Sequence, residues 1–171
     1  ARYGTEQFAS DLVEVMDQLG WERMVVVGHS MGGHNSIGFS AWHPDRVRAL
    51  CVVDSRPALP AERLQAMHRQ GHRGPRRHET IDLALRSFRL MPAETLAAPD
   101  LLEHLGRQGI AERQGHFLYR FDPRCNGTRK PVDCWTLLPQ IKAPTLLVRG
   151  ELSPIMPTEM ARPPRDMRLA P

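Results

Sequence analysis

Cysteine, long apolar runs and targeting signals are what this 171-residue chain has least of. It holds three cysteines, and no two of them form a Cys-x-x-Cys pair, so neither a disulfide framework nor a zinc site is expected. No apolar run approaches the roughly 18 residues of a transmembrane helix. The first six residues also lack the apolar segment of a secretory signal. We therefore expect a cytoplasmic protein with no membrane partner, no metal and no organic cofactor.

Positive charge is concentrated in the middle of the chain. The formal net charge is +4, and residues 58–138 account for the whole excess. Its densest part is a set of six side chains that we call the basic cluster: His68, Arg69, His72, Arg73, Arg76 and Arg77. Nucleic-acid binding normally needs aromatic side chains interleaved with the basic ones, and histidine is the only ring here. We therefore expect a solvated basic loop, and no nucleic-acid partner.

The strongest pattern is Val25–Gly33, which reads Val-Val-Val-Gly-His-Ser-Met-Gly-Gly. A β-branched run enters Gly-x-Ser-x-Gly and a helix-like segment follows, which is the strand–turn–helix context of a nucleophile elbow. Ser30 at the tip would expose its hydroxyl. Gly28 and Gly32 are expected where the backbone is strained and a neighbouring segment of the backbone leaves no room for a Cβ. The N–H of Met31 would lie at a helix N-terminus, where the helix dipole favours an oxyanion.

Apolar periodicity predicts the elements around this motif. It indicates a helix over 6–19, a short strand over 24–27 buried on both faces, a helix from 30 to about 42, and a strand over 47–53. A further strand is expected within 141–150. This alternation is typical of an α/β fold with a parallel sheet flanked by helices.

The alternation stops at Pro57. Residues 58–138 show no strong strand, contain helical stretches at 61–70 and 80–90, and are divided by many prolines and glycines. We interpret this part as a helical insertion into the α/β core.

The chain is thus predicted to have three parts. Residues 1–57 form the core with the elbow, 58–138 form a helical cap insertion, and 139–171 return to the core. The tail is aberrant from about residue 161, because Pro163 and its neighbour interrupt a helix that begins near Thr158.

Three segments resemble the α/β-hydrolase superfamily. Gly-His-Ser-Met-Gly-Gly at 28–33 is a common form of that family's elbow, and Trp-His-Pro-Asp-Arg-Val at 42–47 is similar to its link from the elbow helix to the next strand. Residues 141–157 resemble its seventh strand and the turn after it. The resemblance implies a partial α/β-hydrolase fold, truncated at both ends. It also implies that the catalytic histidine and the upstream oxyanion loop lie outside this chain.

The same resemblance implies a catalytic acid in the turn after the seventh strand, at the position of Ser153. Serine carries no charge and cannot stabilise an imidazolium, so two other carboxylates are candidates. Asp54 ends the strand over 47–53, at the edge of the sheet where Ser30 would lie. Glu151 is in the expected turn but two residues early. Asp54 is favoured, and a loop-capping role is its alternative.

None of the eight histidines occupies the family's position for the base. His29 and Met31 flank Ser30 and are expected near the acyl site, although core packing is the favoured role for His29. His34 is expected to pack or to hydrogen-bond locally. The base is therefore predicted to lie outside this chain. The alternative is a histidine of the cap insertion that reaches Ser30: His68, His72, His78, His104 or His116.

The resemblance predicts an esterase-like serine hydrolase that acts on an ester or related acyl bond of a small molecule. Two alternatives stay open: a catalytically incomplete fragment, and a non-enzymatic binding module of the same fold. The substrate, the oligomeric state and the choice between hydrolysis, acyl transfer and perhydrolysis do not follow from the sequence.

Overall fold

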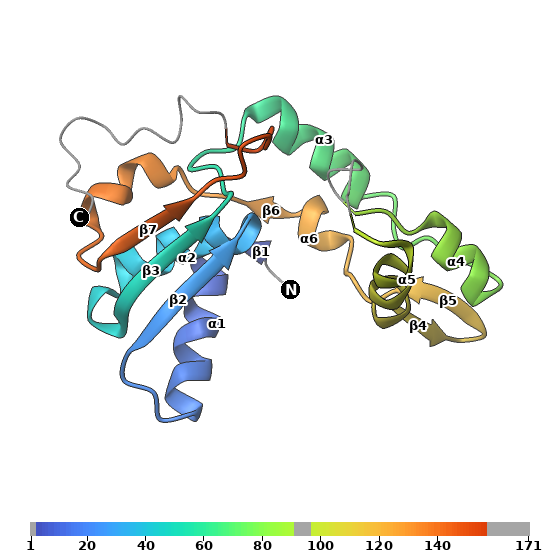
Figure 1. Cartoon of the computed structure of the whole chain (residues 1–171), viewed down its shortest axis with the longest axis horizontal. Coiled ribbons are helices and arrows are strands. Elements are labelled where there is room, and N and C mark those ends of the chain that lie inside the picture. The colour runs from blue at the N-terminus through green and yellow to red at the C-terminus, as the bar shows by residue number, and fades with distance from the viewer. Residues whose placement is uncertain (1–2, 91–96, 157–171) are drawn as a thin grey trace. The chain divides into compact units, whose positions relative to one another are not determined.

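The computed structural model describes residues 3–90 and 97–156, coloured in Figure 1. They belong to two compact units, which we take separately. Unit 1 consists of the described residues of Ala1–Ala66 and Thr128–Pro171, and unit 2 of those of Met67–Gly127. The helix expected near Thr158 lies outside the described residues, as does the break near residue 161. The predicted division at 57 and 138 stays a prediction.

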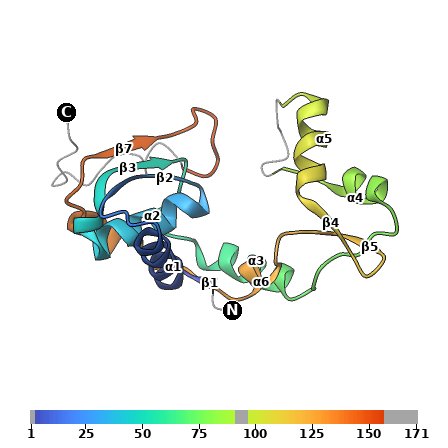
Figure 2. The ribbon, with the colours of Figure 1, turned by 90° about the horizontal axis from the view of Figure 1, so that it is seen from below.

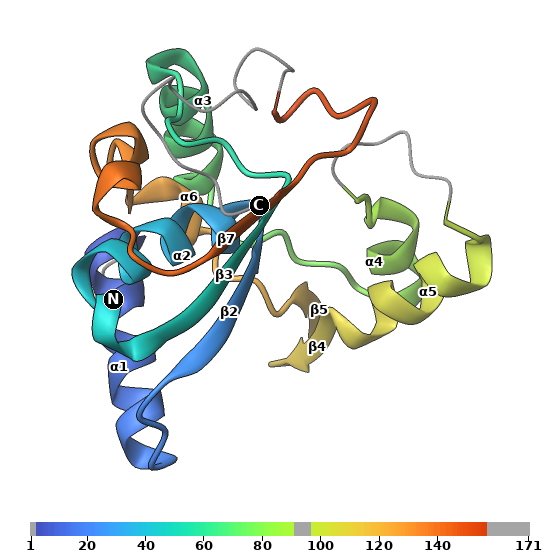
Figure 3. The same ribbon diagram turned by 60° about the vertical axis from the view of Figure 1, so that its left-hand side comes forward.

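Unit 1 contains a three-stranded parallel sheet in the order β2-β3-β7 (Figure 3). Its strands are β2 (Met24–His29), β3 (Val47–Val53) and β7 (Thr145–Val148). Val53 pairs with His29 on one side and with Val148 on the other. Because the strands are parallel and end in register, the turns that follow them emerge at one edge of the sheet.

Two helices, α1 (Thr5–Gln18) and α2 (Met31–Trp42), cover one face of this sheet (Figure 2). Met16 of α1, Phe39 of α2 and Leu50 of β3 are almost fully buried between the layers. The expected helices and strands of this unit are confirmed. Gly20 has a φ of +67° just after α1, as expected for a glycine that ends a helix.

The opposite face of the sheet is not covered by any described helix of unit 1. Val25 and Val27 of β2 are 57% and 68% exposed, and Leu146 of β7 is 60% exposed. The prediction that residues 24–27 are buried on both faces is therefore wrong. An apolar run shows that a strand is suited to burial, but which faces are buried depends on what packs against the sheet.

Short elements complete unit 1. Cys134 and Leu137 join the core beside α2, so the segment after residue 127 is part of the same packed unit. The elements are β1 (Tyr3–Gly4), which pairs in parallel with β6 (Arg129–Lys130), and the 3-10 turns η1 (Pro44–Arg46), η2 (Cys134–Thr136) and η3 (Leu138–Gln140).

Unit 2 contains helices and one β-hairpin. The helices are α3 (Ala61–Gly71), whose first residues belong to unit 1, α4 (Ile81–Ser87), α5 (Pro99–Gln108) and α6 (Arg124–Gly127), and the hairpin pairs β4 (Ile110–Arg113) with β5 (His116–Tyr119). The sequence predicts no strong strand in this region, and the structure has a hairpin of two strands of 4 residues each there. The two strands are joined by Gln114 and Gly115, whose φ angles are +55° and +73°. Positive φ at both loop residues matches the right-handed twist of a tight hairpin.

Candidate active site

Ser30 connects β2 to α2 in an uncommon backbone conformation. Its φ is +53° and its ψ is −115°, a region that residues with a Cβ rarely occupy. The Ser30 N–H donates to the carbonyl of Val53 at 3.0 Å, and the Ser30 carbonyl accepts from the His34 N–H at 3.1 Å. These bonds hold the turn on both sides, and Ser30 is exposed. Such a conformation costs on the order of 1–3 kcal/mol and is characteristic of functional sites.

Glycines beneath the turn allow the chain to approach itself closely. A Cβ on Gly28 would lie 2.5 Å from the carbonyl oxygen of Gly32, and one on Gly33 would lie 2.6 Å from the Cβ of Ser55. A Cβ on Gly32 would meet nothing within 4 Å. The expectation of close approach is confirmed for Gly28 and is wrong for Gly32. Gly32 contributes its backbone to the contact, while its Cβ position faces open space.

Met31 and His29 lie on either side of the nucleophile candidate. Met31 is the first residue of α2, so its N–H belongs to the N-terminal turn, where the helix dipole favours negative charge. His29 is the last residue of β2 and is exposed. The core-packing role favoured for His29 is therefore wrong, and its ring lies at the edge of the sheet that carries Ser30.

Asp54 follows β3 directly and is tied to the turn after β7. Its φ is +45°, and its N–H donates to the Val148 carbonyl at 2.8 Å. Its Oδ2 accepts from the Ser153 hydroxyl at 2.5 Å, and its Oδ1 faces the N–H of Gly150 at 3.4 Å. The Ser153 Oγ in turn accepts from the Ile155 N–H at 3.0 Å. The structure thus brings Asp54 together with the residue at the position where the resemblance places an acid.

Glu151 lies in the same turn without joining this arrangement. It is exposed, and its backbone carbonyl accepts from Arg149 Nη2 at 2.9 Å. Within the described ranges its carboxylate has no hydrogen bond to Asp54 or Ser30. Among the residues that the structure describes, neighbouring groups orient the carboxylate of Asp54 and not that of Glu151.

A buried histidine connects the elbow to the Asp54 turn. His34 is 2% exposed, and its Nδ1 lies 3.1 Å from the carbonyl of Arg56, two residues after Asp54. The carbonyl can only accept, so Nδ1 carries the proton. Burial is the main cause that lowers the pKa of His34, which keeps the ring neutral. The expected packing role of His34 is confirmed, and its ring is also held by a hydrogen bond to a carbonyl 22 residues away in the sequence.

Cys134 packs against the same histidine, and the sequence does not predict this contact. Its Sγ lies 3.5 Å from the His34 Nδ1, and its pKa is raised to about 12 by burial and by the nearby charge of Asp133. A thiol with this pKa remains protonated at neutral pH and is a poor nucleophile. The two residues are 100 positions apart, so no local pattern joins them.

The remaining requirement of the chemistry is a base. Of the other histidines in unit 1, His43 packs against the ring of Phe39 at 5.3 Å, and His29 has no hydrogen bond to Ser30 or Asp54.

The described part of the chain has no group of three or more His, Cys, Asp or Glu side chains placed to hold a metal ion. Nor does it have a helix long and apolar enough to cross a membrane. The arrangement in unit 1 thus brings together an exposed serine, an oriented carboxylate and a helix N-terminus.

Comparisons with known proteins identify the fold of the chain. The family profile described as alpha/beta hydrolase fold matches residues 1–166. A Bacillus subtilis protein provisionally named 2-succinyl-6-hydroxy-2,4-cyclohexadiene-1-carboxylate synthase is 27% identical over 161 residues, which cover 88% of this chain and 56% of that protein. The crystal structure of E-2-(acetamidomethylene)succinate hydrolase superposes with a TM-score of 0.77 at 22% identity, over 94% of this chain and 60% of that one. An alpha/beta hydrolase from Novosphingobium aromaticivorans gives a TM-score of 0.74 at 25% identity, over 93% and 59%. The chain thus spans somewhat more than half the length of these proteins.

Proposed function

Because this chain belongs to the alpha/beta hydrolase family, we propose that the protein is a serine hydrolase acting on an ester or related acyl bond of a small molecule. The observation that carries the proposal is the backbone of Ser30. A strained, exposed serine between a strand and a helix is the geometry that a nucleophile elbow requires. Family membership alone would not specify a serine mechanism, because one fold supports several chemistries.

In this proposal Ser30 attacks the carbonyl carbon of the substrate. A serine hydroxyl is a weak nucleophile until a base removes its proton, and that base is a histidine outside the described residues of unit 1. As the bond forms, the carbonyl oxygen becomes an oxyanion, and the Met31 N–H at the start of α2 donates to it. The resulting acyl-enzyme is then released by water.

Asp54 is the acid in this mechanism. A carboxylate orients the histidine and stabilises the imidazolium that forms when the histidine takes the serine proton. The support for Asp54 is its position at the end of the strand next to Ser30, together with the Ser153 hydroxyl that fixes its Oδ2. Ser153 thus serves as a positioning residue at the place where the resemblance implies an acid. Glu151 is the weaker candidate, since no group in the described part of the chain orients its carboxylate.

Hydrolysis of an activated acetate or butyrate ester tests the proposal. If a histidine of this chain is the base, the chain should release the chromophore faster than buffer does, and Ser30→Ala should abolish that excess. Ser10→Ala is a matched control, because Ser10 is an exposed serine on α1. A serine-directed phosphonate should label the wild type and the Ser10→Ala variant but not Ser30→Ala. Equal rates for wild type and Ser30→Ala would exclude the serine mechanism for this chain.

A catalytically incomplete chain is the second candidate, and the exposed sheet face favours it. Val25, Val27 and Leu146 present apolar side chains to solvent, and the chain covers less than two thirds of the relatives it matches. Thermal unfolding separates this candidate from a folded binding module. A single cooperative transition without Ser30-dependent turnover supports a binding module, whereas no cooperative transition supports an incomplete fold.

A further inference from the structure

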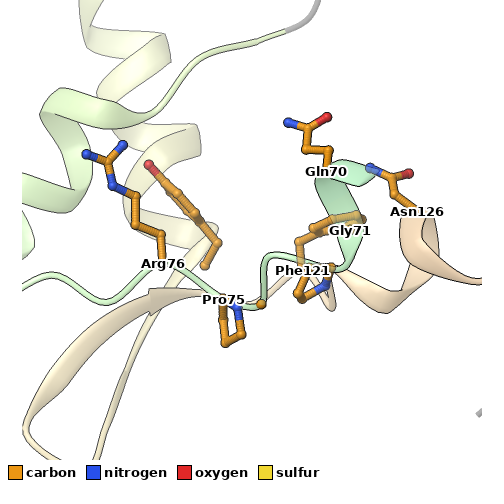
Figure 4. Close-up of a pocket in the computed structure, with 9 residues that line it drawn as sticks. Gln70, Gly71, Pro75, Arg76, Phe121 and Asn126 are labelled. Carbon is orange, nitrogen blue, oxygen red and sulfur yellow. The ribbon is translucent and has the colours of Figure 1, made fainter. Parts of the chain in front are cut away.

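Unit 2 contains a cavity of about 190 Å³ that has no part in the proposed chemistry at Ser30 (Figure 4). All of the residues around it belong to unit 2. Those that matter for its chemistry are Gln70, Pro75, Arg76, Tyr119, Phe121 and Asn126. They come from the end of α3, the loop that follows it, the end of β5 and its next residues, and α6.

The wall on the α3 side is fixed by backbone packing. A Cβ on Gly71 would lie 2.5 Å from the Cα of Gly127 and 2.6 Å from the carbonyl oxygen of Pro123. The end of α3 therefore touches α6 with no side chain between them. Three residues later, Gly74 has a φ of +74° and turns the chain towards Arg76. A ligand would thus meet a wall that exists before it binds, which lowers the entropy lost on binding.

Three polar side chains around the cavity are available to a ligand. The guanidinium of Arg76 and the amides of Gln70 and Asn126 have no hydrogen bond to any described residue. In Figure 4 Arg76 lies at one end of the cavity, and Gln70 and Asn126 lie at the other. The Tyr119 hydroxyl is already engaged.

That hydroxyl lies 2.7 Å from the Ser87 Oγ and 2.9 Å from the Ala84 carbonyl. Tyr119 is therefore held in place at its polar end, and its ring is the part that can line the cavity. In Figure 4 Pro75 lies between the two ends, and Phe121 lies beside Gly71 at the end of Gln70 and Asn126. The lining thus combines flat apolar surface with polar groups at two separate ends.

The charge around the cavity favours an anion. Arg76 belongs to the basic cluster, and the sequence holds no acidic residue between Glu62 and Glu79. Asp122, next to Phe121 in the chain, pairs with Arg124 at 2.7 Å. A guanidinium binds a carboxylate through two parallel hydrogen bonds, which makes Arg76 suited to a carboxylate at its end of the cavity.

We propose that this cavity binds a planar aromatic carboxylate that carries a hydroxyl at its far end, of the 4-hydroxybenzoate class. The volume fits one ring, because a cavity of about 150 Å³ accommodates benzene and a small substituent needs little more. The carboxylate pairs with Arg76, the ring packs on Pro75 and Phe121, and the hydroxyl hydrogen-bonds to the amides of Gln70 and Asn126. The proposal does not depend on the hydrolase function.

Calorimetric titration of the full chain with 4-hydroxybenzoate tests this proposal. We expect saturable binding that Arg76→Gln weakens about tenfold, because it removes a charge-assisted contact. Arg77→Gln is the matched control, since it removes the same charge from a neighbouring residue that does not line the cavity, and it should change the affinity less than twofold. The uncharged 4-hydroxybenzyl alcohol should bind the wild type about as weakly as 4-hydroxybenzoate binds Arg76→Gln.

Two further ligands test the contacts of the hydroxyl and the need for an aromatic ring. Benzoate should bind several-fold more weakly than 4-hydroxybenzoate, and Asn126→Ala should reduce that difference. Inorganic phosphate should compete poorly. Equal losses from Arg76→Gln and Arg77→Gln, phosphate binding as tight as that of the aromatic acid, or no saturable binding would each overturn the proposal. All three substitutions are at residues with solvent access, and unchanged melting temperatures would show that the variants fold.

Discussion

Two turns in this molecule each contain a residue with nearly the same positive φ, but different interactions determine that angle. Ser30 in unit 1 has a φ of +53°, and Gln114 in unit 2 has a φ of +55°. Gln114 lies in a two-residue hairpin loop and is followed by Gly115, which also has a positive φ. Ser30 lies between β2 and α2, and the residue that follows it begins a helix.

The difference shows that a positive φ has two distinct origins here. At Gln114 the hairpin itself requires the conformation, because the twist of the paired strands favours positive φ in a tight loop. At Ser30 the conformation is imposed by packing: Gly28 fits against the Gly32 backbone, and the Ser30 N–H is held by Val53. A strained residue persists only where its surroundings determine it in this way.

Substitution of the glycines beneath Ser30 should give the largest effect. Gly28→Ala places a methyl group against the backbone of Gly32 and against Ser36 Oγ, so the elbow must move. We expect a loss of about 3 kcal/mol in the free energy of unfolding, at the upper end of overpacking effects. Gly32→Ala places its methyl group in open space within α2 and should change stability by less than about 1 kcal/mol, with a gain favoured.

Urea unfolding of the two variants measures this contrast. The pair is well matched, because both changes add one methyl group to a glycine of the same motif. Similar losses for both would show that the packing beneath Ser30 does not determine its conformation, and the two turns would then not differ in origin.

Loss of the His34 contact should have the next largest effect. His34→Ala leaves the Arg56 carbonyl without its buried donor and should cost about 2 kcal/mol. His34→Asn can place an amide N–H near the position of Nδ1, so we expect it to retain more of the stability. The substituted asparagine does not titrate, which makes this variant the control for pH dependence.

The pH dependence of stability follows from the lowered pKa of His34. The ring has an ordinary pKa near 6.5 in the unfolded chain and a lower one when folded, so below about pH 7 the unfolded state binds more protons. Stability should therefore fall as the pH drops through 6.5, and level off below the folded pKa. Urea unfolding between pH 8 and 5 should show a steeper fall for wild type than for His34→Asn. Parallel curves would mean that His34 is not the group responsible.

Relief of the strain at Ser30 is expected to have a smaller effect of opposite sign. Ser30→Gly removes the Cβ that disfavours the observed φ and ψ, and should stabilise the chain by about 1 kcal/mol after the entropic cost of glycine is included. Ser30→Ala keeps the Cβ and should leave stability nearly unchanged. Both remove the proposed nucleophile, so a gain in stability with Ser30→Gly alone separates strain from chemistry. A destabilised Ser30→Gly variant would show that the turn is not strained.

Local sequence patterns are sufficient to predict most of the helices and strands of unit 1. Three consecutive valines, the Gly-x-Ser-x-Gly motif and apolar spacing at three and four residues predicted α1, β2, α2 and β3, because each depends on contacts within a few residues. The position of Ser30 at a strand–helix turn is of the same kind. Asp54 could be named as a candidate because the ends of parallel strands meet at one edge of a sheet.

The remaining features depend on contacts between distant parts of the chain. The exposure of Val25 and Val27 depends on which face is covered, and the pairing of His34 with Cys134 joins positions that no motif relates. The contact between Asp54 and Ser153 likewise requires β7 to lie beside β3. The β4–β5 hairpin was missed for a local reason, since its loop is Gln-Gly, and the strong hairpin signals are Asn-Gly and Asp-Gly.

The smallest predicted effect is at the second of the two turns, the loop between β4 and β5. Gln114→Asn places at φ +55° a residue that tolerates positive φ better, and should stabilise the hairpin by about 0.5 kcal/mol. Gln114 is exposed and its carbonyl accepts from His116 Nδ1 at 3.1 Å, a backbone contact that the substitution leaves in place. Gln108→Asn is the control, because Gln108 ends α5 and there asparagine offers no such advantage.

Amide hydrogen exchange in β4 and β5 measures the change locally. Slower exchange in Gln114→Asn, but not in Gln108→Asn, would support a turn whose conformation is determined by the hairpin and improved by a better-suited residue. If Gln114→Asn has no effect or is destabilising, packing around the loop determines the turn, as it does at Ser30, and the two turns share one origin after all.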